Sequence, residues 1–343
     1  MTRVTVVGNT SWGTTLAIVL ARKRLAVRLW TRTEAEATRL NLDRENKAYL
    51  PGFLLPPDLK VTHVLEEAMA RASLVILAVP SQTMRANIRR IREHLTKDSL
   101  ILSAAKGLEV GTTKRMSEVL AEELPDALLG NILALSGPNL AQEVVRGLLA
   151  TSVVAGQNEE AASAAQELLI TPAFRVYTNS DLVGVELGGA LKNIIALGAG
   201  MGDGFGSGNN AKASLMTRGL AEITRLGVAC GANPLTFAGL AGLGDLVATC
   251  SSSFSRNRHV GEELAKGRPL AEIQASLGHV AEGITTTAAA RKLAQCLKVE
   301  MPITEQMYRV LFEGLDPRQG VAELMGREAK PELAGMGWAS RAG

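Results

Sequence analysis

Aromatic residues are scarce in this chain, at 3% of 343 residues, although the hydrophobic fraction reaches 46%. The core therefore has to be built from Leu, Val, Ile and Ala. With 21% charged residues, the composition is typical of an ordinary soluble globular protein. The length predicts two domains or one large one.

Cysteine and histidine are scarce as well. Cys230, Cys250 and Cys296 lie far apart without a CxxC pair, and the four histidines show no HExxH-type spacing. These absences argue against a disulfide framework and against a metal site. They favour a cytoplasmic protein, because thiols stay reduced in that compartment.

The chain also has little net charge and no long hydrophobic run. The formal charge of +3 is too small to indicate a nucleic acid or a membrane surface as a partner, but it is compatible with a local site for a small anion. No uncharged apolar run approaches the roughly 18–20 residues that a membrane span needs. The first residues already show a strand pattern, so we expect no signal peptide.

The first half of the chain alternates short apolar runs with amphipathic segments. Because the apolar runs have no polar face, they predict strands that are buried on both sides of a sheet. A helix is expected at residues 12–23, with Ser11 as its N-cap. Strands are expected at residues 3–7, 26–31, 73–79, 99–104, 131–135 and 151–155. This alternation predicts a Rossmann-like α/β domain with a doubly wound, mostly parallel sheet.

The pattern changes near residue 180. From there to about residue 327 the sequence shows helical periodicity and glycine-rich turns, and no convincing strand. We therefore expect a Rossmann-like domain at residues 1–180 and an all-α domain at residues 181–328. Residues 329–343 contain Pro331 and three glycines, which predicts a flexible tail.

The turn between the first expected strand and helix carries an altered nucleotide-binding fingerprint. Gly8 and Gly13 occupy the first and last positions of a GxGxxG pattern, while Thr10 replaces the middle glycine. Gly8 permits the tight turn, Gly13 lets helix and strand pack closely, and the helix N-terminus attracts a pyrophosphate. The alternative is a tight strand–helix turn without a ligand. The position in the first βα unit favours a dinucleotide site.

The end of the second expected strand bears on which dinucleotide binds. NAD sites usually place an acid there for the ribose 2′-hydroxyl, whereas this chain has Arg32 and no acid before Glu34. A guanidinium suits a 2′-phosphate because it pairs with phosphate through two hydrogen bonds. NADPH is therefore the expected cofactor, with NADH as the alternative.

Lys192 is unusual because it lies in a helical segment, residues 183–202, of mostly small and apolar residues. Gly188 and Gly189 lie one turn before it on the same face, so that another helix or a ligand can approach the ammonium closely. Burial makes a lysine release its proton more readily, which suits an acid or a base. The alternative is a lysine that extends to solvent at the helix edge. The glycines at 198–208 suit either motion or close helix packing.

Polar residues follow the carboxyl ends of three expected strands. Ser81 and Gln82 come after the first end, Lys106 after the second, and Gly137 and Asn139 after the third. Ligands of open α/β sheets bind beyond these ends, so Lys106 is a candidate contact for a phosphate or a substrate oxygen. A solvated loop lysine and simple turn chemistry are the alternatives.

The helical half supplies a second group of polar residues. Asp245 ends a glycine-rich loop, and Ser255, Arg256 and Asn257 lie at the start of an expected helix. Hydroxyls, an amide and a guanidinium at a helix start make a plausible phosphate site. An exposed helix with an ordinary N-cap is the alternative.

Together these segments resemble the bacterial-type glycerol-3-phosphate dehydrogenase (NAD(P)+) family. The similarity runs in order over nearly the whole chain, and the order and spacing of its KN, GLGDL and SRN motifs are specific. The matching segments are GNTSWGTTLA at 8–17, AAKGLE at 104–109, LSGPNLAQEV at 135–144, ELGGALKNIIALGAGMGDG at 186–204, GLAGLGDLVATC at 239–250, SSSFSRNRHVG at 251–261 and AEGITT at 281–286.

The resemblance implies a role for each matching residue. Lys192 would be the catalytic proton donor and acceptor, and Lys106 would contact both substrate and cofactor. The expected substrate-binding residues are Lys106, Gly137, Asn139, Asp245, Ser255, Arg256 and Asn257. The expected cofactor-binding residues are Gly8, Ser11, Trp12, Gly13, Arg32, Lys106, Ala141, Arg256, Val280 and Glu282. Asn139 stands where the family typically carries a hydroxyl residue.

The resemblance also implies an activity. The protein would be a cytosolic homodimer that reduces dihydroxyacetone phosphate reversibly to sn-glycerol 3-phosphate for phospholipid synthesis. One alternative is another two-domain dehydrogenase of the 6-phosphogluconate or β-hydroxyacid type, although the GLGDL and SRN motifs favour a small phosphorylated substrate. The other alternative is an NADPH-binding sensor without catalysis, against which the presence of Lys106, Lys192 and Asp245 argues.

We expect Arg32→Ala to reduce the preference for NADPH over NADH, because it removes the guanidinium that would pair with the 2′-phosphate. Because charge-assisted hydrogen bonds are strong, the ratio of kcat/KM for NADPH to kcat/KM for NADH should fall by about tenfold or more. Steady-state kcat/KM values with each cofactor, for wild type and variant, measure it. An unchanged ratio of the two efficiencies would contradict the role of Arg32.

Overall fold

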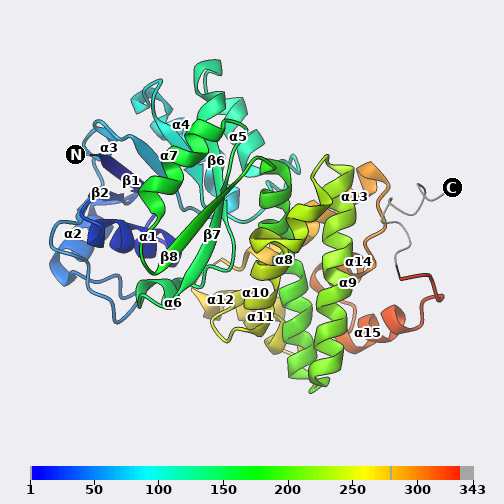
Figure 1. Cartoon of the computed structure of the whole chain (residues 1–343). Coiled ribbons are helices and arrows are strands. Elements are labelled where there is room, and N and C mark those ends of the chain that lie inside the picture. The colour runs from blue at the N-terminus through cyan, green and yellow to red at the C-terminus, as the bar shows by residue number, and fades with distance from the viewer. Residues whose placement is uncertain (1, 279, 333–343) are drawn as a thin grey trace.

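A computed structural model describes residues 2–278 and 280–332 of the chain. In Figure 1, an α/β half coloured from blue to green lies beside a helical half coloured from green to red. The predicted flexible tail at residues 329–343 lies outside the described residues from residue 333 onward.

The described residues of the α/β half form one eight-stranded sheet in the order β3-β2-β1-β4-β5-β6-β7-β8. All neighbouring strands pair in parallel except β6 and β7, which are antiparallel. The strands are β1 (Arg3–Val7), β2 (Ala26–Trp30), β3 (Lys60–Thr62), β4 (Leu74–Leu77), β5 (Leu100–Ser103), β6 (Ile132–Ser136), β7 (Ala150–Ala155) and β8 (Phe174–Asn179). The predicted mostly parallel sheet is confirmed.

Helices cover both faces of this sheet. Val4 and Val6 of β1 point into one apolar cluster, and Val7 points into another, because side chains alternate along a strand. The first cluster packs under α1 (Ser11–Arg22), α2 (Glu34–Asp43), α6 (Ala141–Val145) and α7 (Glu159–Leu169). The second packs under α3 (Leu65–Met69), α4 (Met84–Ile91) and α5 (Met116–Glu123). The predicted doubly wound arrangement is therefore confirmed as well.

Two strands of the sheet were not predicted from the sequence. β3 is only three residues long, and β8 alternates buried residues, such as Phe174 and Val176, with exposed ones, such as Arg175 and Tyr177. The burial pattern of β8 shows that only one of its faces is covered. A search for wholly apolar runs overlooks such a strand.

The predicted N-cap of the first helix is wrong by one residue. Ser11 is the first residue of α1, and Thr10 is the N-cap. The Thr10 hydroxyl accepts a hydrogen bond from Gly13 N at 3.1 Å and donates one to Ala78 O at 2.8 Å. The side chain that replaces the middle glycine of the fingerprint thus ties α1 to the end of β4.

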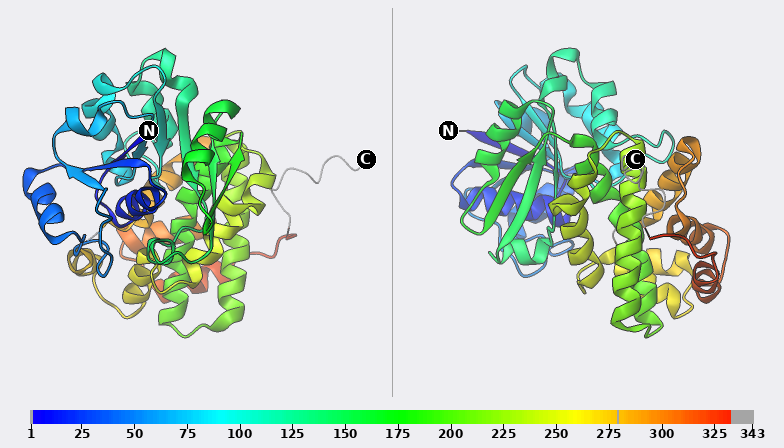
Figure 2. Two further views of the ribbon diagram at one scale, coloured as in Figure 1. Left: turned by 60° about the vertical axis from the view of Figure 1, so that its left-hand side comes forward. Right: turned by 45° about the vertical axis from the view of Figure 1, so that its right-hand side comes forward.

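The helical half is organised around α8 (Leu182–Gly204), the long helix that carries Lys192. Both views in Figure 2 show α8 beside the equally long α9 (Gly208–Ala229). The other helices are η4 (Pro234–Ala238), η5 (Leu240–Gly244), α10 (Asp245–Ser251), α11 (Arg256–Ala265), α12 (Leu270–Leu277), α13 (Glu282–Leu297), α14 (Pro302–Phe312) and α15 (Pro317–Met325). These helices bury a second, separate apolar core with α8.

The start of α8 connects the two halves. β8 ends at Asn179, and Asp181 caps α8 by accepting a hydrogen bond from Gly184 N at 2.9 Å. Leu182 and Val185 then pack against residues of β6 and β7. This packing holds the first turns of α8 against the sheet and places Lys192 between the two halves.

Glycines let α8 and α11 approach each other closely. A Cβ on Gly200 of α8 would lie 1.8 Å from Arg258 O, and a Cβ on Gly261 of α11 would lie 1.9 Å from Leu197 O. No side chain fits at such distances. At these positions the glycines therefore serve close helix packing rather than motion.

By length and composition α8 is apolar enough to cross a membrane, but 83% of its apolar stretch is buried inside the protein. No other helix of the described residues is both as long and as apolar. Its apolar character is thus explained by its position at the centre of the helical core.

We expect Gly200→Ala to lower the free energy of unfolding by about 1–3 kcal/mol, because the added methyl group forces α8 and α11 apart. Gly202→Ala is the matched control, because a Cβ there meets nothing within 4 Å. The control should be neutral or stabilise the helix by up to about 1 kcal/mol. Urea unfolding measures both, and equal stability of the two variants would contradict the close approach.

Candidate active site

A cavity of about 900 Å³ lies between the sheet and the helical half. It opens beyond the carboxyl ends of β1, β2, β4 and β5, and residues of α8, α10, α11 and α13 line its other side. The predicted site residues in its wall are Gly8, Ser11, Trp12, Arg32, Lys106, Asn139, Ala141, Lys192, Asp245, Ser255, Arg256, Asn257, Val280 and Glu282. Gly13 and Gly137 lie outside the wall.

Asp245 lies between two lysines in this cavity. Its Oδ1 accepts a hydrogen bond from Lys192 Nζ at 2.9 Å, and its Oδ2 accepts one from Lys106 Nζ at 2.7 Å. Asp245 is 2% exposed and Lys192 is 6% exposed. Gly189 lets the end of β6 approach α8 beside these lysines, because a Cβ there would lie 2.5 Å from Ser136 Oγ. The side chain of Lys192 is therefore buried and paired, not extended to solvent.

Burial and the neighbouring charges shift the pKa values of Lys106 and Asp245. Burial lowers the pKa of Lys106 to about 8; Asp245 opposes this decrease, and the ammonium of Lys192 adds to it. Burial favours the protonated form of Asp245, but the two ammonium groups together hold the pKa of that carboxyl below its usual range. At neutral pH the cluster thus keeps an ionised carboxylate beside its lysines.

Two residues that the sequence analysis did not single out complete the cluster. Thr249 lies one turn after Asp245 on α10; its hydroxyl accepts a hydrogen bond from Lys192 Nζ and donates one to Asp245 Oδ1 at 3.2 Å. Asn193 donates to Lys106 O at 3.2 Å. Because residues four apart lie on the same face of a helix, the spacing of Asp245 and Thr249 could have predicted that Thr249 belongs to the site.

The turn after β6 also faces the lysines. Lys106 Nζ donates to Gly137 O at 2.8 Å, and Gly137 has a φ of +127°, which favours glycine. Asn139 Nδ2 donates to Ser152 Oγ at 3.0 Å, while Asn139 Oδ1 is buried and has no partner among the described residues. Because Asn139 lies in the cavity wall, this unsatisfied oxygen suits a polar ligand.

The turn after β1 has the shape and the donors of a dinucleotide site. Gly8 has a φ of +105°, and a Cβ on Gly13 would lie 2.1 Å from Gly8 O. The side-chain donors Asn9 Nδ2 and Trp12 Nε1 are buried near the cavity, and neither has a partner within residues 2–278 and 280–332. Two free donors beside a helix N-terminus fit a pyrophosphate or ribose.

Arg32 lies in the cavity wall just beyond the end of β2. It is exposed, and it makes no hydrogen bond or ion pair within the described part of the chain. Its guanidinium is therefore available to an anion.

The start of α11 is built as predicted, but its polar groups differ in availability. Ser255 is the N-cap and accepts a hydrogen bond from Arg258 N at 3.2 Å. Asn257 Nδ2 donates to Asn193 Oδ1 at 2.8 Å, and Asn257 Oδ1 accepts from Gly283 N at 3.0 Å. Arg256 extends into the cavity, where loss of hydration lowers its pKa against the opposing effect of Glu282. Arg256 is thus the group of this set that is free for a ligand.

Glu282, the first residue of α13, links the two halves. Its carboxylate accepts hydrogen bonds from Ser81 N at 2.9 Å and from the Ser81 hydroxyl. Burial raises the pKa of Glu282, although these bonds and Arg256 oppose the increase. Ser81 follows β4, so this contact closes the cavity along one edge.

Comparisons with known proteins agree with this geometry. Residues 3–162 match the N-terminal model, and residues 181–322 the C-terminal model, of NAD-dependent glycerol-3-phosphate dehydrogenase. The chain belongs to this family. The predicted resemblance and the enzyme class are therefore confirmed, and the comparisons do not support the alternative dehydrogenases or the sensor protein.

Individual relatives match nearly the whole chain. Glycerol-3-phosphate dehydrogenase (NAD(P)+) of Dehalococcoides mccartyi is 53% identical over 98% of this chain and 94% of its own length. The enzyme of the same name from Bacillus mycoides is 49% identical over 97% of this chain and 98% of its own. The crystal structure of glycerol-3-phosphate dehydrogenase from Coxiella burnetii superimposes with a TM-score of 0.90, at 39% identity, over 95% of this chain and 99% of its own.

We expect Asp245→Asn to lower the free energy of unfolding at pH 7 by about 3–5 kcal/mol, because it leaves two buried ammonium groups without a counter-charge. Asp203→Asn is the matched control. Asp203 also lies between two cations, Lys212 and Arg258, but its side chain is 20% exposed. Its loss should therefore cost about 1 kcal/mol or less. Urea unfolding measures both variants. If both lose the same free energy of unfolding, the Asp245 cluster is not buried as described.

Proposed function

We propose that this chain catalyses the reversible, NAD(P)H-dependent reduction of dihydroxyacetone phosphate to sn-glycerol 3-phosphate. The observation that carries the proposal is the buried Lys192–Asp245–Lys106 cluster in a cavity that continues to a dinucleotide-type turn. Two ammonium groups against one carboxylate leave a positive site, which suits a phosphorylated carbonyl compound.

In this proposal Lys192 exchanges the proton. The nicotinamide cofactor, when bound, supplies or accepts the hydride. Lys192 protonates the oxygen that becomes negative at C2 during reduction, and it takes that proton back during oxidation. Two of its three N–H donors are held by Asp245 and Thr249, so one remains for the substrate oxygen.

We assign the substrate phosphate to Arg256, because its guanidinium is free in the cavity and lies at the N-terminus of α11. Lys106, Gly137 and the unpartnered Asn139 Oδ1 would contact the rest of the substrate. Ser255, Asn257 and Asp245 would hold the contacting groups in place, since their side chains already bind neighbouring residues.

For the cofactor we propose contacts from both halves of the protein. Gly8, Ser11, Trp12, Gly13 and Ala141 would form the dinucleotide site at the first turn. Arg32 would bind the 2′-phosphate, so NADPH is the proposed preferred cofactor. Lys106, Arg256, Val280 and Glu282 would contact the cofactor from the other side.

No metal takes part in the proposed reaction, because ammonium groups supply the charge near the substrate oxygen. In the described part of the chain no three His, Cys, Asp or Glu side chains cluster as metal ligands. We also propose residues 1–180 as the dinucleotide-binding domain and 181–328 as the substrate domain. The protein would act as a cytoplasmic homodimer in glycerophospholipid synthesis.

Oxidation of NADPH with dihydroxyacetone phosphate tests the proposal directly. The loss of absorbance at 340 nm should depend on dihydroxyacetone phosphate and should not occur with other 2-keto substrates. Comparison with NADH measures the cofactor preference. In the reverse direction, faster reduction of NADP+ with a β-hydroxyacid or 6-phosphogluconate than with sn-glycerol 3-phosphate would refute the proposed substrate.

We expect Lys192→Ala to lower kcat by about 10²–10⁴-fold, the usual contribution of general acid catalysis. NADPH binding, measured by fluorescence titration, should stay near the wild-type value, because Lys192 acts on the substrate oxygen. Lys266→Ala, which removes an exposed lysine on the same half, is the control and should leave kcat unchanged. Wild-type turnover in Lys192→Ala would rule out its catalytic role.

A further inference from the structure

Lys106 lies in a segment without helix or strand, residues 104–115, between β5 and α5. Its ammonium nevertheless has to meet Asp245 Oδ2 and Gly137 O, both at hydrogen-bond distance. An irregular segment places a side chain reproducibly only if neighbouring residues hold its backbone.

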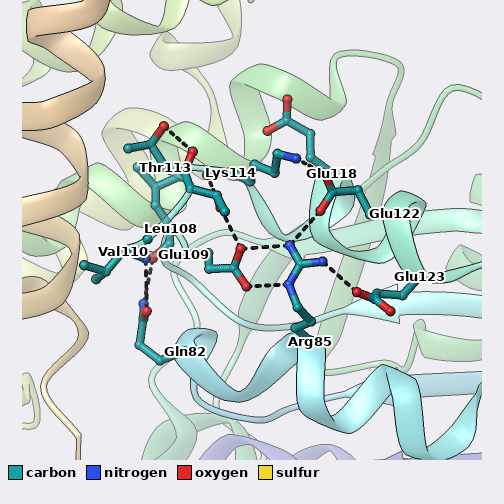
Figure 3. A network of polar contacts seen from close by, with 12 residues as sticks. Gln82, Arg85, Leu108, Glu109, Val110, Thr113, Lys114, Glu118, Glu122 and Glu123 are labelled. Carbon is teal, nitrogen blue, oxygen red and sulfur yellow. Dashed lines mark hydrogen bonds and ion pairs between the residues drawn. The ribbon is translucent and has the colours of Figure 1, made fainter.

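Gln82 binds the backbone of this segment with both ends of its side-chain amide. Gln82 Nε2 donates to Leu108 O at 2.6 Å, and Val110 N donates to Gln82 Oε1 at 3.0 Å. Figure 3 shows these two contacts from one side chain. Gln82 thus binds the backbone of Leu108 and Val110 as a neighbouring strand would. Leu108 is two residues after Lys106, and Val110 is four residues after it.

Arg85, which lies three residues after Gln82, binds the side chain of Glu109. The two residues pair through two parallel bonds, Nε to Oε1 at 2.9 Å and Nη2 to Oε2 at 2.8 Å. Figure 3 shows the Arg85 guanidinium among three carboxylates, since Glu122 and Glu123 of α5 each bind it at 2.7 Å. Carboxylates on both sides fix the direction of the guanidinium and with it the position of Glu109.

The helical half holds the same segment from the opposite side. Leu108 is fully buried and belongs to the apolar core of the helical half, and Asn193 of α8 donates to Lys106 O. Between these anchors Gly107 has no space for a side chain, because a Cβ would lie 2.5 Å from Ser81 Oγ. The backbone on both sides of Lys106 is therefore held, and Gln82 and Arg85 supply the anchors from the α/β half.

The contacts differ in what they add to stability. Gln82 is exposed, so its two hydrogen bonds contribute little to the free energy of unfolding. The two-bonded Arg85–Glu109 pair belongs to a part-buried charge network, so it stabilises the segment as well. Their geometric effect is larger, because displacing a substrate-contacting group by about 1 Å can change rates strongly.

We propose that Gln82, Arg85 and Glu109 are positioning residues for Lys106, here called the Lys106 clamp. The clamp keeps the ammonium of Lys106 between Asp245 and Gly137, where the substrate would meet it. This inference rests on the proposed function of Lys106 and adds residues that touch neither substrate nor cofactor.

The test uses the full-length enzyme with the double variant Gln82→Met/Glu109→Gln. Its KM for dihydroxyacetone phosphate should rise about tenfold, and the Kd for NADPH should rise less than the KM, because most of the proposed cofactor contacts come from other residues. Arg89→Gln is the matched control, because Arg89 binds Glu123 in the same charge cluster but does not touch residues 104–115. The control should leave KM unchanged.

A double-mutant cycle separates positioning from general loosening. In a Lys106→Met background, the clamp substitutions should change KM no further, because the group that they position is gone. The same increase in both backgrounds, or no increase in either, would overturn the proposal. If Lys106→Met itself leaves KM unchanged, the clamp hypothesis is wrong as well, whereas dihydroxyacetone phosphate turnover still decides the proposed function.

A measurement without substrate tests the clamp even if dihydroxyacetone phosphate is not turned over. Acylation of Lys106 by a water-soluble lysine reagent, followed by mass spectrometry, reports its exposure and proton affinity. The clamp variant should label Lys106 severalfold faster or slower than wild type, and Arg89→Gln should label it at the wild-type rate. Equal rates in all three proteins would refute the clamp.

Discussion

The Asp245 carboxylate holds the ammonium groups of Lys106 and Lys192, and most of the cavity depends on this contact. A buried carboxylate between two buried cations satisfies charges that would each be costly alone. The contact also joins three segments from both halves of the protein: the loop after β5, the middle of α8 and the start of α10. The same contact therefore forms the site and holds the two halves together.

The fold supplies this contact by bringing its elements unusually close together. Gly189 admits the Ser136 hydroxyl to the surface of α8, and the glycines at the α8–α11 crossing let the helix that carries Arg256 pack against the helix that carries Lys192. The parallel sheet contributes its carboxyl ends, where the turn after β1 and the loop after β5 meet. Apolar packing around α8 then fixes the distances between these elements.

Much of the fold was predictable because its signals are local. Buried strands such as β1 and β4 are short apolar runs, and α11 begins at the predicted polar cluster, where Ser255 is its N-cap. β8 escaped prediction because only one of its faces is covered, so that its apolar residues alternate with exposed ones. Thr10 took the capping role expected of Ser11, and its hydroxyl also reaches Ala78 O. The candidate residues were found by resemblance and by their places after strands and loops, but their mutual contacts were not.

The sequence by itself determined the α/β-then-helical order, the aliphatic core, the turn at Gly8 and the presence of Lys106, Lys192, Asp245 and Arg256. These properties depend on residue type and on periodicity over a few positions. Only the tertiary structure decided that Asp245 binds both lysines, that Glu282 binds Ser81 and that Gln82 holds the backbone beyond Lys106. Such contacts join residues far apart in the chain, and their distances are set by the packing of whole helices and strands.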